Sequence, residues 1–264
     1  MTIIQAIILA VVEGLTEFLP ISSTAHMKFT NPIIGVTSTP FSDMFEIVIQ
    51  LAAILAVVVV YYKKFFDFSR FNFYIKLIVA VIPAIIFGVL LKKHIDSALG
   101  NLYFMAWVMV GGGVLFLFVD KWFTNPRIDD EQQVSNRNAF VIGCFQVLSI
   151  LLPGFSRSAS TIIGGMSQKL TRKAAAEFSF FLAVPTMLAA SVKSFWDVHK
   201  EHPDVLSKEN ASLLGLSSIV TFFVAIIVIR FFIGFLKKYG FKPWGYYRII
   251  VGLVMLVLLW RGML

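Results

Sequence analysis

Two carboxylates lie four residues apart near the start of the chain, at Glu13 and Glu17, in a segment that is otherwise mostly apolar. If this segment is helical, the spacing puts both side chains on one face of the helix, about one turn apart. Two like charges at this separation repel each other unless a proton or a cation lies between them. The pair therefore predicts a site for a divalent cation, Mg²⁺ or Ca²⁺. The alternative is two acids that are solvated at the outer surface of a membrane.

Hydroxyl groups and an imidazole follow the two acids, in the sequence PISSTAH of residues 20–26. Ser23 and His26 are three residues apart, which suits a nucleophile with its base, or a hydroxyl and an imidazole that both bind a phosphate. Serines are also common in membrane helices, where they bond back to backbone carbonyls, so the spacing alone is weak evidence. Its position beside the paired acids favours chemistry, with Ser22 and Thr24 as substrate contacts.

A second polar segment, PGFSRSAST at residues 153–161, combines an arginine with hydroxyls and a glycine. Arg157 offers a planar fork for bidentate contact with phosphate, and the N–H groups that begin the next helix would point at the same oxygens. Gly154 permits an unusual backbone turn, and Ser156 and Ser158 add hydroxyl groups. This segment therefore predicts an anion site. The alternative is that Arg157 extends to the cytoplasmic surface.

The composition shows what surrounds these segments. The chain has 264 residues, of which 58% are hydrophobic and 14% charged. A soluble domain has about 25% charged residues, so this is a membrane protein with several spans. The net charge is +8, but the basic residues form short clusters between apolar runs, which indicates membrane topology and no nucleic-acid partner. The single cysteine, Cys144, excludes an internal disulfide and a multi-cysteine metal site.

Six apolar stretches are predicted to cross the bilayer as helices. Two further runs, residues 2–12 and 139–152, are shorter than the roughly 17 to 25 residues that a crossing needs. Each leads into one of the two polar segments, so we predict two re-entrant helical hairpins. Backbone that is not helical can lie at membrane depth only where protein or water satisfies it, which typically marks a functional centre. The predicted spans are residues 44–62, 77–91, 99–119, 177–195, 211–236 and 246–260.

Charge in the connecting loops predicts the orientation. Residues 63–76 and 237–248 are rich in lysine and arginine, the second loop ending in Arg248, and both are predicted to be cytoplasmic. Counting spans from there puts residues 196–210, an acid-rich loop that includes Asp204, on the outer side. The pair Lys92–Lys93 does not fit this assignment.

An internal repeat is predicted within this single membrane domain. An offset of 133 residues aligns Glu13 with Gln146 and Ser23 with Ser156. The halves, about 1–132 and 133–264, would each contain one hairpin and three spans. Because three is odd, the halves must be inverted, so the first hairpin enters from outside, the second from the cytoplasm, and their tips meet near the midplane. Such repeats are common in secondary transporters.

Five segments of this chain resemble the bacterial undecaprenyl-diphosphate phosphatase family, which is associated with bacitracin resistance. The resemblance covers essentially the whole chain, and its long motifs mix charge, hydroxyl groups and glycine in a fixed order. One departure is Ala159, where the family commonly has glycine. The segments are EGLTEFLPISSTAH, FEIVIQLAAILAVV, PGFSRSAST, EFSFFLAVPTM and YYRIIVG.

The resemblance implies a membrane hydrolase that removes the terminal phosphate of undecaprenyl diphosphate, so that the monophosphate carrier returns to cell-wall synthesis. It also implies the bacterial cytoplasmic (inner) membrane, with a site that opens to the outer face. The family's acidic motif falls on Glu13 and Glu17, its serine and histidine motif on Ser23 and His26, and its arginine motif on Arg157.

Two mechanisms and two other functions stay open at this stage. Ser23 could attack phosphorus to form a phosphoserine, with His26 as base or proton donor, or a metal-activated water could attack instead. The main other function is a transporter or flippase of the lipid carrier, which predicts lipid movement without phosphate release. A purely structural subunit predicts that alanine at Glu17 changes only stability. The oligomeric state, including a homo-oligomer, is also open.

Overall fold

The computed structural model describes residues 1–202, 205 and 207–264, and these fold almost entirely into helices. Asp204, which the sequence analysis assigned to the outer loop, lies outside the described residues. The helices are α1 (Ile3–Thr16), α2 (Ser23–Ile33), α3 (Pro40–Val60), α4 (Tyr62–Phe65), η1 (Phe68–Arg70), α5 (Phe71–Leu90), α6 (Lys92–Leu99), α7 (Leu102–Trp122), η2 (Glu131–Gln133), α8 (Asn136–Leu151), α9 (Arg157–Ser167), α10 (Arg172–Glu201), α11 (Lys208–Tyr239) and α12 (Lys242–Trp260).

Six of these helices are long and apolar enough to cross a membrane, which confirms the predicted number of spans. They are α3, α5, α7, α10, α11 and α12. Several begin earlier than predicted because polar residues form their first turns. Lys76, for example, lies within α5 rather than in a loop, and its ammonium group donates to the carbonyl of Gln132 at 2.7 Å. A long lysine side chain can extend from an apolar helix to a polar loop in this way.

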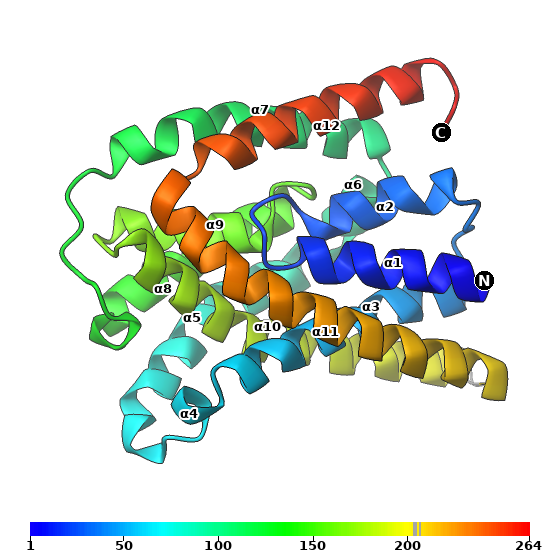
Figure 1. Ribbon diagram of the computed structural model, residues 1–264. Coiled ribbons are helices and arrows are strands. Elements are labelled where there is room, and N and C mark those ends of the chain that lie inside the picture. The colour runs from blue at the N-terminus through cyan, green and yellow to red at the C-terminus, as the bar shows by residue number, and fades with distance from the viewer. Residues whose placement is uncertain (203–204, 206) are drawn as a thin grey trace.

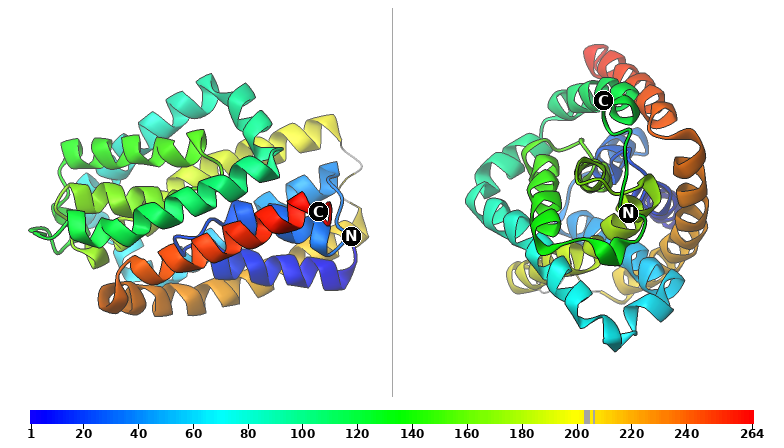
Figure 2. Two further views of the ribbon diagram at one scale, coloured as in Figure 1. Left: turned by 90° about the horizontal axis from the view of Figure 1, so that it is seen from above. Right: turned by 90° about the vertical axis from the view of Figure 1, so that its left-hand side faces the viewer.

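The two short apolar runs form helical hairpins. The first consists of α1, with 14 residues, and α2, with 11; the second consists of α8, with 16 residues, and α9, with 11. In each pair the two helices pack against each other. The two tips meet, as predicted. The hydroxyl of Ser158, in the second tip, donates to the carbonyl of Leu19, in the first tip, at 2.9 Å. Seen end on, α9 and the blue α1–α2 pair lie inside a ring of longer helices (Figure 2, right).

The cap residues correct the predicted alignment of the two tips. Ser22 caps α2 and Ser156 caps α9, and both have left-handed backbones, with φ of 71° and 84°. The caps are therefore related by an offset of 134 residues rather than 133. The first tip has one residue between its proline and its cap serine, whereas the second has two. It follows that Ser23 corresponds in position to Arg157, since each is the first residue of its helix.

The helices pack in pairs across the molecule. α7 lies along α12, and α3 packs against both α10 and α11 (Figure 1). α1 packs against α11, whereas α8 packs against α5. Each hairpin is thus held by a long helix, and the two tips are enclosed between these pairs.

Glycine permits some of these helices to approach closely. On α7, a Cβ added at Gly113 would lie 2.8 Å from the carbonyl oxygen of Gly245 on α12. A Cβ added at Gly111, two residues earlier on the same helix, would meet nothing within 4 Å. Small residues at such crossings allow close backbone packing, which helps to associate helices in a membrane.

Gly111 and Gly113 give a matched test of the α7–α12 contact. We expect Gly113→Ala to lower the stability of the detergent-purified protein by about 1–3 kcal/mol, because the methyl group displaces backbone. Gly111→Ala should be neutral or stabilising, since glycine disfavours a helix interior by about 1 kcal/mol relative to alanine. Thermal unfolding of the two variants provides the measurement, and equal melting temperatures would contradict the assigned contact.

Candidate active site

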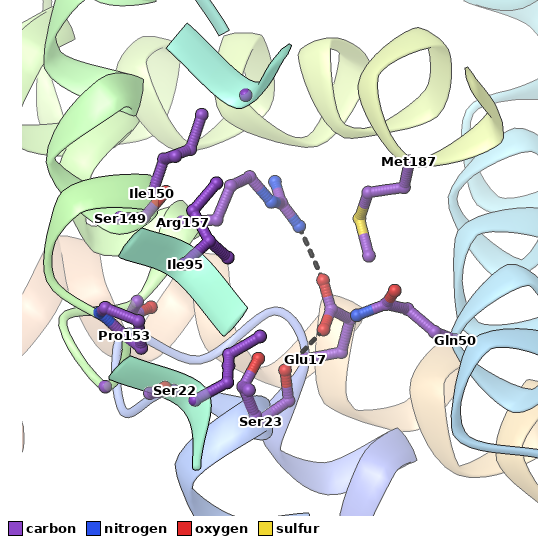
Figure 3. A pocket seen from close by; sticks show the side chains of 15 residues that line it. Glu17, Ser22, Ser23, Gln50, Ile95, Ser149, Ile150, Pro153, Arg157 and Met187 are labelled. Carbon is purple, nitrogen blue, oxygen red and sulfur yellow. Dashed lines mark hydrogen bonds and ion pairs between the residues drawn. The ribbon is translucent and has the colours of Figure 1, made fainter. Parts of the chain in front are cut away.

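A cavity of about 280 Å³ lies where the two hairpin tips meet. Its polar lining comes mainly from the tips, and α3 and α10 contribute one side chain each (Figure 3). The predicted site residues that line it are Glu17, Ser22, Ser23, Thr24, Gly154, Ser156 and Arg157. The structure therefore brings together side chains that are more than 130 residues apart in the sequence.

Glu17 is the centre of this site. Its carboxylate accepts from the Ser23 hydroxyl at 2.6 Å through Oε2 and from the Arg157 guanidinium at 2.8 Å through Oε1. In Figure 3 the two dashed lines converge on it from opposite sides. Arg157 also donates to the carbonyl of Ser179 on α10, at 3.2 Å. Arg157 thus points into the site and does not extend to the surface, which rules out the alternative considered for it.

The remaining hydroxyls mostly hold the tips in shape. The Ser22 hydroxyl accepts from the N–H of Ala25, and the Ser156 hydroxyl accepts from that of Ala159. The Ser158 hydroxyl is bonded to the first tip and does not line the cavity. The first N–H groups of a helix have no partner within the helix, and a helix N-terminus carries partial positive charge. Because the first residues of α2 and α9 both line the cavity, two such termini face it.

His26 lies elsewhere. Its Nδ1–H donates to the carbonyl of Ser22 at 2.7 Å, and its Nε2 pairs with the hydroxyl of Tyr247 on α12 at 2.9 Å. Since a carbonyl can only accept, Nδ1 carries the proton, and Nε2 of the neutral ring accepts from Tyr247. The Ser23 hydroxyl is bonded to Glu17 instead. The predicted contact between Ser23 and His26 is therefore not formed, because each side chain is bonded to a different partner.

Glu13 is buried beside this site but faces a different space. It is 2% exposed, its Oε1 has no hydrogen-bond partner, and it lines a second cavity of about 700 Å³. Lys28 and Glu46, which form an ion pair at 3.2 Å, also line this second cavity. The two cavities adjoin, since both are lined by Thr24, Gln50 and Leu99.

Glu13 and Glu17 can supply only part of the ligand shell of a divalent cation. Among the described residues there is no group of three or more His, Cys, Asp or Glu side chains that could hold a metal ion. Mg²⁺, however, is commonly held by one or two carboxylates, with substrate oxygens and water completing its shell. The unpartnered oxygen of Glu13, next to Glu17, suits this arrangement. A cage of six to eight protein oxygens, as Ca²⁺ prefers, is not formed by these two side chains.

Sequence reasoning missed Gln50, whose side chain points toward Glu17 from α3 (Figure 3). It lies within a predicted span, and a lone amide in an apolar run is a signal that could have identified it. Arg248 was assigned to a basic cytoplasmic loop, and this assignment is wrong. It lies inside α12 with 0% exposure and bonds to backbone carbonyls of both tips.

The ion pair between Glu17 and Arg157 generates a stability prediction. The two side chains are 4% and 14% exposed, and removing one partner of a buried pair typically costs about 3–5 kcal/mol. We expect Glu17→Gln and Arg157→Met to couple by about 2 kcal/mol in a double-mutant cycle, measured by unfolding in detergent micelles. The more exposed pair of Asp67 and Arg70 is the control and should couple clearly less, because solvent screens it. Additive effects at Glu17 and Arg157 would contradict the pairing.

Comparisons with known proteins show the family of this chain. The family described as "Bacitracin resistance protein BacA" matches residues 6–254. A relative from Porphyromonas gingivalis, named undecaprenyl-diphosphatase, is 49% identical over 99% of this chain and 98% of its own. Relatives of the same name from Flavobacterium psychrophilum and Campylobacter jejuni are 49% and 42% identical, over 98% and 99% of this chain and 96% of their own. The chain therefore belongs to the bacitracin resistance protein BacA family.

Proposed function

We propose that this protein hydrolyses undecaprenyl diphosphate to undecaprenyl phosphate and inorganic phosphate, which returns the lipid carrier to cell-wall synthesis. The relatives are named for this substrate. The observation that carries the proposal is the arrangement at Glu17, whose carboxylate holds a serine hydroxyl and an arginine at one point among apolar helices. Transfer of a phosphoryl group requires a nucleophile, a base and a group that binds the anion.

Recognition of the diphosphate would rest on positive charge. Arg157 and the N-termini of α2 and α9 face the cavity, and such groups bind phosphate oxygens. In the structure Arg157 is paired with Glu17. An incoming phosphate competes with Glu17 for the Arg157 guanidinium. Once the guanidinium binds the phosphate, Glu17 is free to take a proton. Substrate binding would thereby prepare the base.

The chemical step would begin at Ser23. Its oxygen attacks the terminal phosphorus, the bond from that phosphorus to the bridging oxygen breaks, and the lipid monophosphate leaves with the bridging oxygen. Glu17 takes the hydroxyl proton, because the two atoms are 2.6 Å apart. Glu17 then passes this proton to the departing lipid monophosphate and is a carboxylate again. In the second step a water molecule gives a proton to Glu17 and attacks the phosphoserine, the bond from phosphorus to the Ser23 oxygen breaks, and Glu17 returns the proton to that oxygen as inorganic phosphate leaves. Glu17 thus takes the role of base that the sequence suggested for His26.

A divalent cation would be held by Glu13 and Glu17 in this scheme. When bound, it would neutralise phosphate oxygens and stabilise the charge that develops on them. The competing scheme, in which water attacks the diphosphate directly, uses the same residues but leaves no phosphate on Ser23.

The orientation and the repeat belong to the same proposal. We propose that the protein lies in the bacterial cytoplasmic membrane, as an inverted repeat of about residues 1–132 and 133–264, with the site open to the outer face. Two packing relations support the repeat, since α1 packs on α11 as α8 packs on α5, and α7 pairs with α12. The cavity beside Glu13 is lined by the beginning of α3, which the loop charges assign to the outer side. Nothing in the comparisons favours the transporter alternative.

Phosphate release from a polyprenyl diphosphate by the purified protein tests the proposed function. We expect Ser23→Ala and Glu17→Gln to lower kcat by at least about 100-fold, because each removes a group that acts in the chemical step. Arg157→Lys should raise KM by about 10-fold or more, since lysine lacks the planar fork. Ser212→Ala, at an exposed hydroxyl of α11, is the control. Lipid movement across vesicles without phosphate release would favour the transporter.

Rapid quenching separates the two chemical routes. With substrate labelled on its terminal phosphate, we expect label to appear on Ser23 before free phosphate accumulates, and to be absent from Ser23→Ala. Chelation of divalent ions should abolish turnover, and addition of Mg²⁺ should restore it. Turnover without labelled serine under every quench condition would rule out the phosphoserine route. Full activity in chelator would rule out the cation.

A further inference from the structure

Arg248 is a buried arginine that contacts both hairpin tips. Its Nη1 donates to the carbonyl of Pro20 at 3.3 Å and to that of Phe155 at 3.0 Å. Its Nη2 donates to Gly154 at 2.9 Å and to Val108 of α7 at 3.2 Å. One side chain therefore joins the backbone of the first tip, the second tip and a long helix. Among the described residues no carboxylate forms an ion pair with it.

The fold provides a dedicated space for this side chain. Burying a charge without an acid is costly, so the surroundings must supply compensating groups. Four carbonyl dipoles do this, together with the rings of Phe116 and Phe155 at 5.0 and 5.8 Å from the guanidinium carbon. A Cβ added at Gly112 would lie 2.5 Å from Nη2, so glycine is needed there to make room.

Tyr247, the preceding residue on α12, reaches the first tip through His26. The two rings are stacked, with centroids 5.7 Å apart and planes 14° apart, and the Tyr247 hydroxyl donates to Nε2 of His26 at 2.9 Å. The other ring nitrogen of His26 donates to the carbonyl of Ser22. Ser22 has the left-handed backbone that caps α2, and it directly precedes Ser23.

We propose that Tyr247 and Arg248 form a clamp on α12 whose role is to position the site, by holding the backbone of both tips. Neither residue lines the cavity. A left-handed backbone at a residue other than glycine costs about 1–3 kcal/mol and persists only where its surroundings impose it. Ser22 and Ser156 both have this conformation, and the clamp bonds to residues within two positions of each. The clamp thereby directs Ser23 and Arg157 at the same carboxylate.

This inference rests on the proposed hydrolysis and predicts an effect on turnover rather than on binding. A displacement of about 1 Å at a reacting group can cost about 100-fold in rate. Arg248→Lys keeps the charge, but its single nitrogen cannot replace the two guanidinium nitrogens that reach four carbonyls, so part of the clamp is lost. We expect kcat to fall at least about 30-fold with KM changed by less than about 3-fold. Tyr247→Phe keeps the stacked ring and loses only the hydroxyl, so kcat should fall about 5-fold.

The experiment measures phosphate release per folded molecule of the full-length protein, together with thermal unfolding. Tyr246→Phe is the control for Tyr247→Phe, and Arg261→Lys is the control for Arg248→Lys. Both side chains are exposed, Tyr246 beside Tyr247 and Arg261 at the C-terminal cap of α12, and both variants should behave as wild type. The clamp would be overturned if Arg248→Lys and Tyr247→Phe both fold and keep a kcat within about 2-fold of wild type. A loss of activity that merely follows the folded fraction would also overturn it.

If Arg248→Lys does not fold, Tyr247→Phe decides the question alone, since it removes one hydroxyl and retains the ring. The unaltered protein distinguishes this inference from the proposed function. No phosphate release by wild type would refute the hydrolysis, whereas normal release by wild type and by both clamp variants would refute only the clamp.

Discussion

The two hairpins are interrupted among helices of membrane length, and the interruptions leave carbonyl groups without a partner in their own helix. Lipid cannot hydrogen-bond these carbonyls, and this constraint shapes the centre of the molecule. The carbonyls of Pro20, Gly154 and Phe155 lie at such breaks and are all satisfied by Arg248. The carbonyl of Leu19 is satisfied by the Ser158 hydroxyl of the other tip. Each tip thus depends on groups from elsewhere in the chain for its backbone bonds, which is why the two tips are held together rather than separated by lipid.

The same breaks are the source of the chemistry. A continuous helix across the membrane would place its positive end at a surface, whereas two interrupted helices place theirs beside a cavity within the bundle. Arg157 and Ser23 occupy the first positions of those helices, and Glu17 lies between them. The opposite charges of Arg157 and Glu17 satisfy each other. In the proposed mechanism a phosphate replaces Glu17 as the partner of Arg157, and Glu17 keeps its hydrogen bond from the Ser23 hydroxyl.

Close helix packing holds the two tips in this arrangement. Gly113 lets α12 approach the backbone of α7, and Gly112 makes room for the guanidinium that α12 sends inward. Gly14 and Gly143 similarly bring α1 against α11 and α8 against α5. The hairpins are therefore held on their outer sides by glycine crossings and on their inner sides by hydrogen bonds to their tips.

Hydropathy and local motifs were enough to predict the number of spans and the two hairpins, because they report directly on burial. They also selected Glu17, Ser23 and Arg157, which line one cavity in the structure. The contacts between particular atoms could not be predicted in this way. His26 is three residues from Ser23 yet bonds to Tyr247, and Arg248 reads as a loop charge yet joins both tips. These contacts link residues separated by some 90 to 230 positions. Such pairings depend on how helices rotate and cross, which local periodicity does not specify.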